Sequence, residues 1–213
     1  MEIISTNLAQ PKTIIYNGNK VTTGIYKTPT KSPIYLGENT VRDDEVTDRK
    51  NHGGTFKACY LFSKNQYRYW ENLYPDLVWN WGMFGENLTV SNLDETTIYI
   101  GDIYTIGDAI VQITQPREPC FKFGFKLGSM NALKQFIDHG YSGTYVRVLK
   151  PGLVKNGDTF ELIDRPKNSL TTFQFFNILF AKQKDEQLIK LAINNDALPE
   201  GKRNKLKAFL KSN

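Results

Sequence analysis

The chain has 213 residues, 40% of them hydrophobic, and a mean hydropathy of −0.44, which indicate a globular protein with one sizeable core. Because no window is apolar enough and Met1–Asn7 lack a basic run followed by an apolar one, we expect neither a membrane span nor a secretory leader. The formal net charge of +5 comes from the C-terminal part, because residues 1–166 hold 18 basic and 18 acidic side chains whereas residues 167–213 hold 9 and 4. Such an excess on a helical segment is typical of a solvated face, so we expect no nucleic-acid binding, with a basic tail that contacts nucleic acid or another anionic partner as the alternative.

Residues 12–165 consist of short β-type runs separated by turn dipeptides. Thr13–Tyr16 and Val21–Tyr26 flank Asn17-Gly18, a pair that accepts the positive φ of a tight hairpin turn, so they predict a β-hairpin. Further strands are predicted at 97–100, 102–106, 109–114, 145–149 and 159–163. Many short strands at this spacing favour a closed or nearly closed β-barrel over a layered α/β fold.

Two helices are expected to cover the ends of the barrel. Ser63 and Gln66 have the spacing of a capping box for a helix over 65–74. Ser129 is the expected N-cap of a helix over 131–139, which Gly140 would end.

Beyond Arg165-Pro166 the apolar spacing becomes helical, and breaks near 184–185 and 198–199 predict three short helices. We therefore divide the chain into a mainly β barrel domain, residues 1–166, and a three-helix C-terminal extension, residues 167–213.

The run Gln115–Cys120, Gln-Pro-Arg-Glu-Pro-Cys, presents a lone cysteine after an alternating strand. Its two prolines keep the loop extended, and Arg117 would stabilise the thiolate, the form that attacks or binds a metal. A buried, inert cysteine is the alternative, but the polar, proline-bounded setting favours a reactive one. Two cysteines are too few for a disulfide scaffold, and we expect both to be reduced in the cytoplasm.

The two histidines differ in their settings. His52 precedes Gly53 and Gly54, which let a ligand approach the backbone closely, so His52 is a candidate for proton transfer. A solvated turn histidine is the alternative. His139 falls in the last turn of a predicted helix, where we expect a structural role. The Cys and His positions lack the spacing of a zinc site, and no phosphate-loop, serine-hydrolase or dinucleotide motif is present.

Glu86 and Asn87 lie between Gly85 and the start of a predicted strand. They could bind a polar ligand, and a turn whose polar groups satisfy one another is the alternative.

Taken together, four runs resemble the MOSC domain, specifically its YiiM-like branch: His52-Gly53-Gly54, Phe84–Thr89, Ile100–Ile103 and Gln115–Cys120. The resemblance covers nearly the whole chain and implies a MOSC-type β-barrel, similar to the pyruvate kinase barrel, with short covering helices and the three-helix extension. It also implies binding of molybdenum cofactor, molybdopterin, whose pterin dithiolene holds the metal while Cys120 supplies a further sulfur ligand.

The resemblance also implies roles for single residues. Lys27 and His52 match a lysine and a histidine that stand with the cysteine in YiiM-like proteins. Cys120 would bind the metal, His52 would donate a proton, and Lys27 would hold negative charge on the substrate oxygen or the cofactor. The expected cofactor contacts are Arg117, Glu86, Asn87, Gly53 and Arg147.

The activity implied is reductive cleavage of an N-hydroxyl bond, as in 6-N-hydroxylaminopurine. Because the chain has no flavin or nicotinamide motif, a separate flavin-type reductase would supply the electrons. A non-catalytic cofactor carrier or sulfur-transfer module is the alternative use of the same thiol. In the branch a Gly-Asp-x-Gln-Ala-Asp run usually precedes His-Gly-Gly, and here the segment 43–48 keeps only Asp44 and Asp48 of it.

Overall fold

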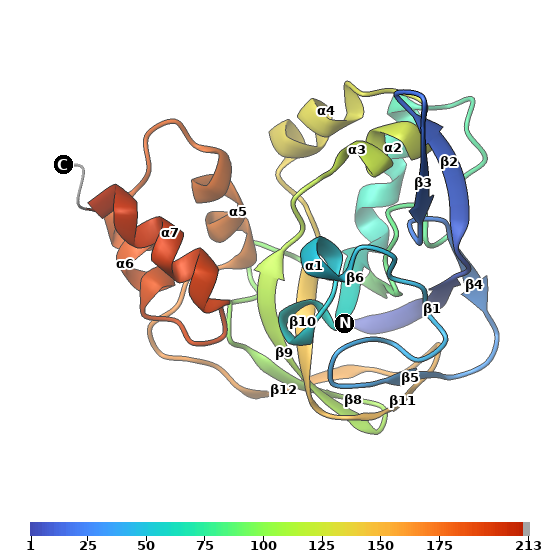
Figure 1. Ribbon diagram of the computed structural model, residues 1–213. Coiled ribbons are helices and arrows are strands. Elements are labelled where there is room, and N and C mark those ends of the chain that lie inside the picture. Colours follow the sequence, from blue (N-terminus) through green and yellow to red (C-terminus); the bar gives the residue numbers. More distant parts are fainter. Residues whose placement is uncertain (211–213) are drawn as a thin grey trace.

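The computed structural model describes residues 1–210, apart from the side chains of residues 50 and 51. Its strands are β1 (Glu2–Ala9), β2 (Lys12–Tyr16), β3 (Asn19–Thr23), β4 (Lys27–Thr30), β5 (Ile34–Leu36), β6 (Cys59–Ser63), β7 (Leu88–Ser91), β8 (Ile103–Ile106), β9 (Ala109–Pro116), β10 (Thr144–Lys150), β11 (Gly152–Val154) and β12 (Phe160–Asp164). Its α-helices are α1 (Arg49–His52), α2 (Tyr67–Leu73), α3 (Phe121–Lys126), α4 (Ala132–His139), α5 (Thr172–Phe180), α6 (Glu186–Ile193) and α7 (Glu200–Leu210), and its 3-10 turns are η1 (Thr55–Lys57) and η2 (Lys64–Gln66). Helices α5 to α7 lie together on one side of the strands (Figure 1).

Eight strands form one mixed sheet in the order β12-β8-β9-β10-β6-β7-β1-β4, with β6 and β7 parallel and the other neighbours antiparallel. Although this order is open, β1 also bonds to the segment that leads into β12. Ile3 N donates to Asp158 O at 2.9 Å, and Phe160 N donates to Met1 O at 3.0 Å. These bonds join distant parts of the sheet, and the mainly β fold expected from the sequence is confirmed.

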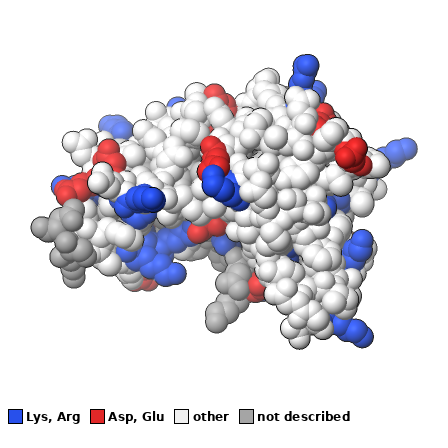
Figure 2. Space-filling model, turned by 90° about the horizontal axis from the view of Figure 1, so that it is seen from above, with Lys and Arg blue, Asp and Glu red and all other residues white. Residues whose placement is uncertain are grey.

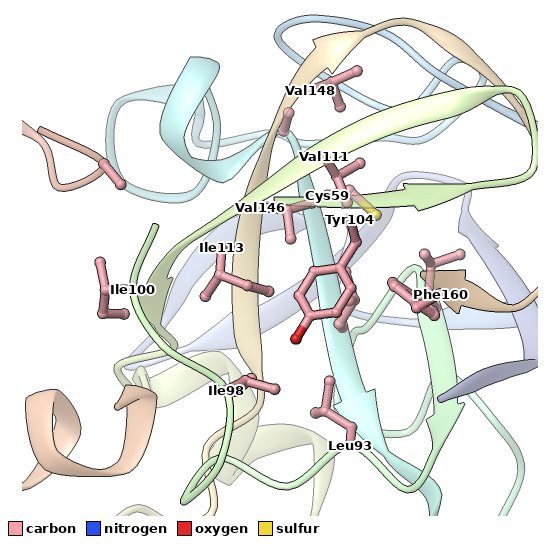
Figure 3. Packing of buried hydrophobic residues seen from close by; sticks show 14 of the residues in the cluster. Cys59, Leu93, Ile98, Ile100, Tyr104, Val111, Ile113, Val146, Val148 and Phe160 are labelled. Carbon is pink, nitrogen blue, oxygen red and sulfur yellow. The ribbon is translucent and has the colours of Figure 1, made fainter. Parts of the chain in front are cut away.

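A first apolar cluster fills the space between the strands. Ala109, Val111 and Ile113 alternate along β9 and are at most 1% exposed, because successive side chains of a strand point to opposite faces. Figure 3 shows Val111 and Ile113 beside inward-pointing residues of β6, β8, β10 and β12, namely Cys59, Tyr104, Val146, Val148 and Phe160. Full burial of a Val, Ile or Phe side chain stabilises the fold by about 1.5–3 kcal/mol.

A second cluster is mostly aromatic and joins α2, α3 and α4. Trp70, Phe123 and Phe136 are completely buried, with ring centres 5.6 Å apart between Trp70 and Phe123 and 5.2 Å apart between Phe123 and Phe136. Phe84 stacks on Phe62 of β6 at 3.9 Å. Such ring pairs add to the energy of burial, and they attach the helix that follows Cys120 to the strands.

The two covering helices are confirmed, but their predicted N-caps are wrong. Ser63 is the buried last residue of β6, its hydroxyl makes no capping bond, and a 3-10 turn separates it from α2. Ser129 also lies outside the cap, since Asn131 flanks α4 and makes no side-chain capping bond. Gly140 adopts a φ of 81° at the end of α4, as expected of a C-terminal glycine.

The predicted hairpin is confirmed as β2 and β3, with φ of 49° at Asn17 and 76° at Gly18. The predicted strand at 97–100 is wrong. Ile98 and Ile100 are buried on alternate positions as in a strand, but Ile98 N bonds back to Asp94 O in a turn, and only an isolated bridge joins Tyr99 to Thr171.

The three helices predicted beyond residue 166 are confirmed. Thr171 and Gln174 form a capping box at the start of α5, and Asp185 caps α6. Phe175, Ile189 and Leu206, one buried side chain from each helix, belong to the same apolar cluster as the strands, whereas Phe176 of α5 belongs to the aromatic cluster. The domain boundary at residues 166 and 167 stays a prediction. None of the helices within residues 1–210 has the length and apolarity needed to cross a membrane.

Candidate functional site

A pocket brings together residues from distant parts of the chain, and it spans about 640 Å³ of space free of protein atoms, including the solvent at its open mouth. Lys27 at the start of β4, His52 at the end of α1 and Cys120 just before α3 all line it. Arg117 and Asn87 line it too. Five of the residues selected from the sequence therefore face one space.

Cys120 flanks the N-terminus of α3 with an extended backbone, φ −127° and ψ 167°, and its side chain is half-buried. Its carbonyl accepts a hydrogen bond from Phe123 N at 2.9 Å, which ties the residue to the first turn of the helix. Cys59 lies in the core, where burial raises the pKa of its thiol far above the ordinary value. Of the two thiols, Cys120 is the one that a ligand in the pocket can reach.

Arg117 has a buried guanidinium that donates a hydrogen bond to Phe84 O. It lies 5.2 Å from the ring centre of Tyr60 and 5.3 Å from that of Phe123, so aromatic faces surround the charge. Among the ion pairs formed within the described residues, none includes Arg117. Burial alone would lower the pKa of Arg117, but the neighbouring tyrosines and Cys120 raise it, and the guanidinium stays charged. Its effect on the thiolate stays a prediction.

Lys27 forms a buried ion pair with Asp44, and the two side chains are 6% and 3% exposed. Asp44 also accepts hydrogen bonds from Ala9 N at 2.8 Å and from Asn87 Nδ2 at 2.9 Å. Because every partner is itself fixed by β1, β4 or the turn before β7, the Lys27 ammonium is held in one place at the pocket wall. Asp44 is one of the two acidic residues that the chain keeps from the branch pattern.

His52 ends α1, where its backbone N donates to Asp48 O at 2.8 Å. Burial lowers the pKa of its imidazole to about 4, and the positive charges of Lys122 and Arg117 contribute to the shift. With the charges of the chain alone, His52 is therefore neutral at pH 7. His139 differs in position: its ring stacks on Tyr69 at 3.7 Å, outside the pocket lining, in the packing role expected for it.

Two further lysines line the pocket, and the sequence reasoning did not select them. Lys57 lies with its ammonium 5.4 Å from the ring centre of Tyr145, and burial followed by the charge of Lys202 lowers its pKa. Lys122 is buried, with its Nζ 3.9 Å from an oxygen of Asp48. The signals were present in the sequence, since Lys57 lies five positions after His52 and Lys122 lies two positions after Cys120.

Glu86, a predicted cofactor contact, is completely buried and is not among the pocket-lining residues. Its carboxylate accepts hydrogen bonds from Gly82 N at 2.9 Å, Phe84 N at 3.1 Å and Thr89 Oγ1 at 2.7 Å, and also from the Tyr67 hydroxyl. With four donors it fixes the turn that precedes β7, so its geometry is that of a structural residue.

Gly53 and Arg147, the remaining predicted contacts, also lie outside the pocket lining. Arg147 Nε donates to Gln112 Oε1 at 2.6 Å across β10 and β9, and its guanidinium lies 5.5 Å from the ring centre of Phe56. Gly53 N bonds to Arg49 O at 3.2 Å. Neither residue lines the pocket, and their roles in cofactor binding stay predictions.

The pocket lining has an excess of positive charge. Its cationic side chains are Lys27, Lys57, Arg117 and Lys122, and its carboxylates are Asp44, Glu45 and Asp48. Lys27 and Asp44 neutralise one another, which leaves three cations facing two carboxylates. The site therefore suits an anionic ligand.

The family model for the MOSC domain matches residues 48–161, more than half of the chain. The chain belongs to the MOSC family. This MOSC protein is 37% identical over 199 residues to the protein YflK of Bacillus subtilis, covering 93% of this chain and 89% of YflK. It is 36% identical over 152 residues to a Gibberella moniliformis protein named Reductase, where the match covers 70% of this chain and 27% of the fungal protein.

Its fold is similar to that of YiiM from Geobacillus stearothermophilus, with a TM-score of 0.81, 31% sequence identity and 97% of each chain covered. The protein is thus a YiiM-like MOSC protein, as the sequence motifs indicated. The match to the family begins at Asp48 and ends at Glu161, so it includes His52, Lys57 and Cys120 but neither Lys27 nor α7.

Proposed function

We propose that this protein binds molybdenum cofactor in the pocket beside Cys120 and reduces N-hydroxylated compounds there. The observation that supports the proposal most strongly is the shared pocket of Cys120, His52 and Lys27, which places a thiol, an imidazole and an ammonium around one space. Membership of the MOSC family supports the cofactor, because MOSC domains are known as molybdenum cofactor-binding domains.

The residues of the pocket fit this cofactor better than a metal ion that the protein alone would hold. Within the described part of the chain, no group of three His, Cys, Asp or Glu side chains could hold an ion. A metal that a pterin dithiolene already chelates needs only one more soft ligand, and Cys120 can supply it. The positively charged lining suits the phosphate of the pterin, and Lys57, Arg117 and Lys122 are the candidate side chains for it.

Bound in this way, the cofactor would supply the two electrons of the reaction by changing the oxidation state of its metal. The N–O bond breaks, the nitrogen and the oxygen take up two protons in all, and the products are the amine and water. Lys27 would hold the departing oxygen, since its ammonium is fixed by Asp44. His52 would deliver a proton once an anion in the pocket raises its pKa from about 4 toward neutrality.

The electrons must come from outside the chain, and we assign their delivery to a separate flavin-type reductase. The fungal relative named Reductase supports a redox role for this family segment. The substrate is a small molecule with an N-hydroxyl group, of which an N-hydroxylated purine is the expected example.

The first experiment measures molybdenum and pterin per chain after anaerobic purification from a host that makes the cofactor. Wild type should carry near-stoichiometric metal and Cys120→Ala should lose it, while Cys59→Ala serves as a matched control that removes the core thiol. Activity is then assayed with a chemical electron donor and an N-hydroxylated base. Retention of metal and activity by Cys120→Ala would contradict the proposal, and cofactor binding without turnover would point to the carrier or sulfur-transfer alternative.

A further inference from the structure

The loop that carries Cys120 is attached to the C-terminal helix. Glu118, two positions before Cys120, forms an ion pair with Lys202 of α7. The Lys202 side chain is only 19% exposed, and its Nζ lies 5.7 Å from the ring centre of the buried Phe175 of α5. The lysine stem therefore runs across the extension and ends on the loop.

Consecutive residues of this loop are held from opposite sides. Arg117 is drawn inward by its bond to Phe84 O and by the aromatic rings around it. Glu118 is held outward by Lys202, and Pro119 restricts the backbone between Glu118 and Cys120. Among the ion pairs of the described residues, Glu118 takes part only in the one with Lys202. Without it, the position of Cys120 would depend on Arg117 and α3 alone.

Lys202 also lies close enough to the pocket to act on it electrostatically. Burial lowers the pKa of the pocket-lining Lys57, and the charge of Lys202 is the next largest cause. Figure 2 shows several Lys and Arg side chains, with acidic side chains among them, on the flank of the molecule where the C-terminal helices lie. Helix α7 is thus a neighbour of the pocket, although it lies outside the part of the chain that matches the MOSC family.

We infer that Lys202 is a positioning residue for Cys120, and that α7 completes the site by holding the 117–120 loop in place. The extension then has a function in the site beyond covering the strands. The inference rests on the proposed function only in taking Cys120 as the reactive residue, because the contact itself concerns the geometry of the chain.

The test compares the full-length variants Lys202→Met, Lys202→Arg and Lys202→Glu with wild type. The first readout is amide hydrogen exchange of residues 117–123, and the second is the rate at which iodoacetamide modifies Cys120. Because a partly exposed ion pair contributes little energy, we expect about a two- to five-fold rise in exchange in this loop for Lys202→Met, and a larger rise for Lys202→Glu. Lys202→Arg should retain wild-type values.

Lys207→Met is the matched control, since Lys207 is exposed on the same helix. Combining Lys202→Glu with Glu118→Lys restores opposite charges and should recover much of the protection, which a general loss of helix stability would not do. Equal exchange and equal alkylation in Lys202→Met, Lys202→Glu and Lys207→Met would overturn the inference. Metal content measured in parallel separates the two proposals: a protected loop without cofactor in wild type would reject the proposed function and leave Lys202 in its positioning role.

Discussion

The buried ion pair between Lys27 and Asp44 makes a strong prediction about stability. Asp44→Asn keeps the size of the side chain and one acceptor oxygen for Ala9 N or Asn87, but it removes the negative charge that faces Lys27. Since the two side chains are 6% and 3% exposed, water cannot replace the lost partner. Breaking a buried pair from one side costs about 3–5 kcal/mol, which is a large part of the total stability of about 5–15 kcal/mol that a protein has.

Urea unfolding followed by tryptophan fluorescence measures this cost. With a slope of about 2 kcal/mol per molar urea, the midpoint should fall by about 1.5–2.5 M. Asp138→Asn is the matched control, because the Lys134 to Asp138 pair on α4 is 74% and 56% exposed and should contribute only about 0.3–0.5 kcal/mol. Equal losses for Asp44→Asn and Asp138→Asn would refute the reasoning. Replacing both partners, as Lys27→Met with Asp44→Leu, should recover part of the loss because no uncompensated charge remains.

Two further predictions concern the pocket. The pKa of His52 is about 4 in the folded chain and about 6.5 in an unfolded chain. As the pH falls, the unfolded state therefore takes up the proton first, and the free energy of unfolding should decrease between pH 6.5 and pH 4. His52→Gln should lessen this decrease, measured in thermal melts, and an anion such as phosphate should raise the His52 pKa measured by NMR. A His52 pKa near 6.5 without any anion would contradict the burial of a neutral imidazole. Gly24 lines the pocket, and a Cβ there would lie 1.9 Å from Glu45 O. Gly24→Ala should therefore weaken cofactor binding, whereas Gly201→Ala on α7, where the added Cβ meets no atom within 4 Å, should bind normally and gain up to about 1 kcal/mol of stability.

Short sequence patterns correctly predicted those structural elements that neighbouring residues alone determine. Asn17-Gly18 marks the hairpin because both residues adopt positive φ there. The same spacing of Ser or Thr and Gln occurs twice with opposite results, however. Thr171 and Gln174 form a capping box, whereas Ser63, with Gln66, forms none because it is buried at the end of β6. A capping pattern therefore predicts a helix start only where the first residue is free of a strand, and tertiary pairing decides that.

The residues of the candidate site also form two groups, those that a short sequence pattern identifies and those whose role depends on the fold. Cys120 and His52 could be found because each lies in a short motif, and Lys27 because it matches a lysine of the YiiM-like branch; the fold brings the three to one pocket. Glu86 stood in an equally suggestive motif, but the surrounding turn supplies donors to its carboxylate, and no feature of the sequence distinguishes a carboxylate that binds a ligand from one that closes a turn. The place of Lys57 in the pocket depends on packing against Tyr145, which lies far from it in the sequence.

The basic residues that are in excess along the sequence are not the ones that give the pocket its positive charge. The excess of basic residues lies in the segment 167–213, and Figure 2 shows basic and acidic side chains interspersed over the face that it draws. The pocket cations Lys27, Lys57, Arg117 and Lys122 come instead from the part of the chain where basic and acidic residues are equal in number. Their effect arises because burial removes water from around them, so a few enclosed charges attract an anion more strongly than many solvated ones. Lys202 connects the two groups, since it belongs to the basic tail and ends at the Cys120 loop.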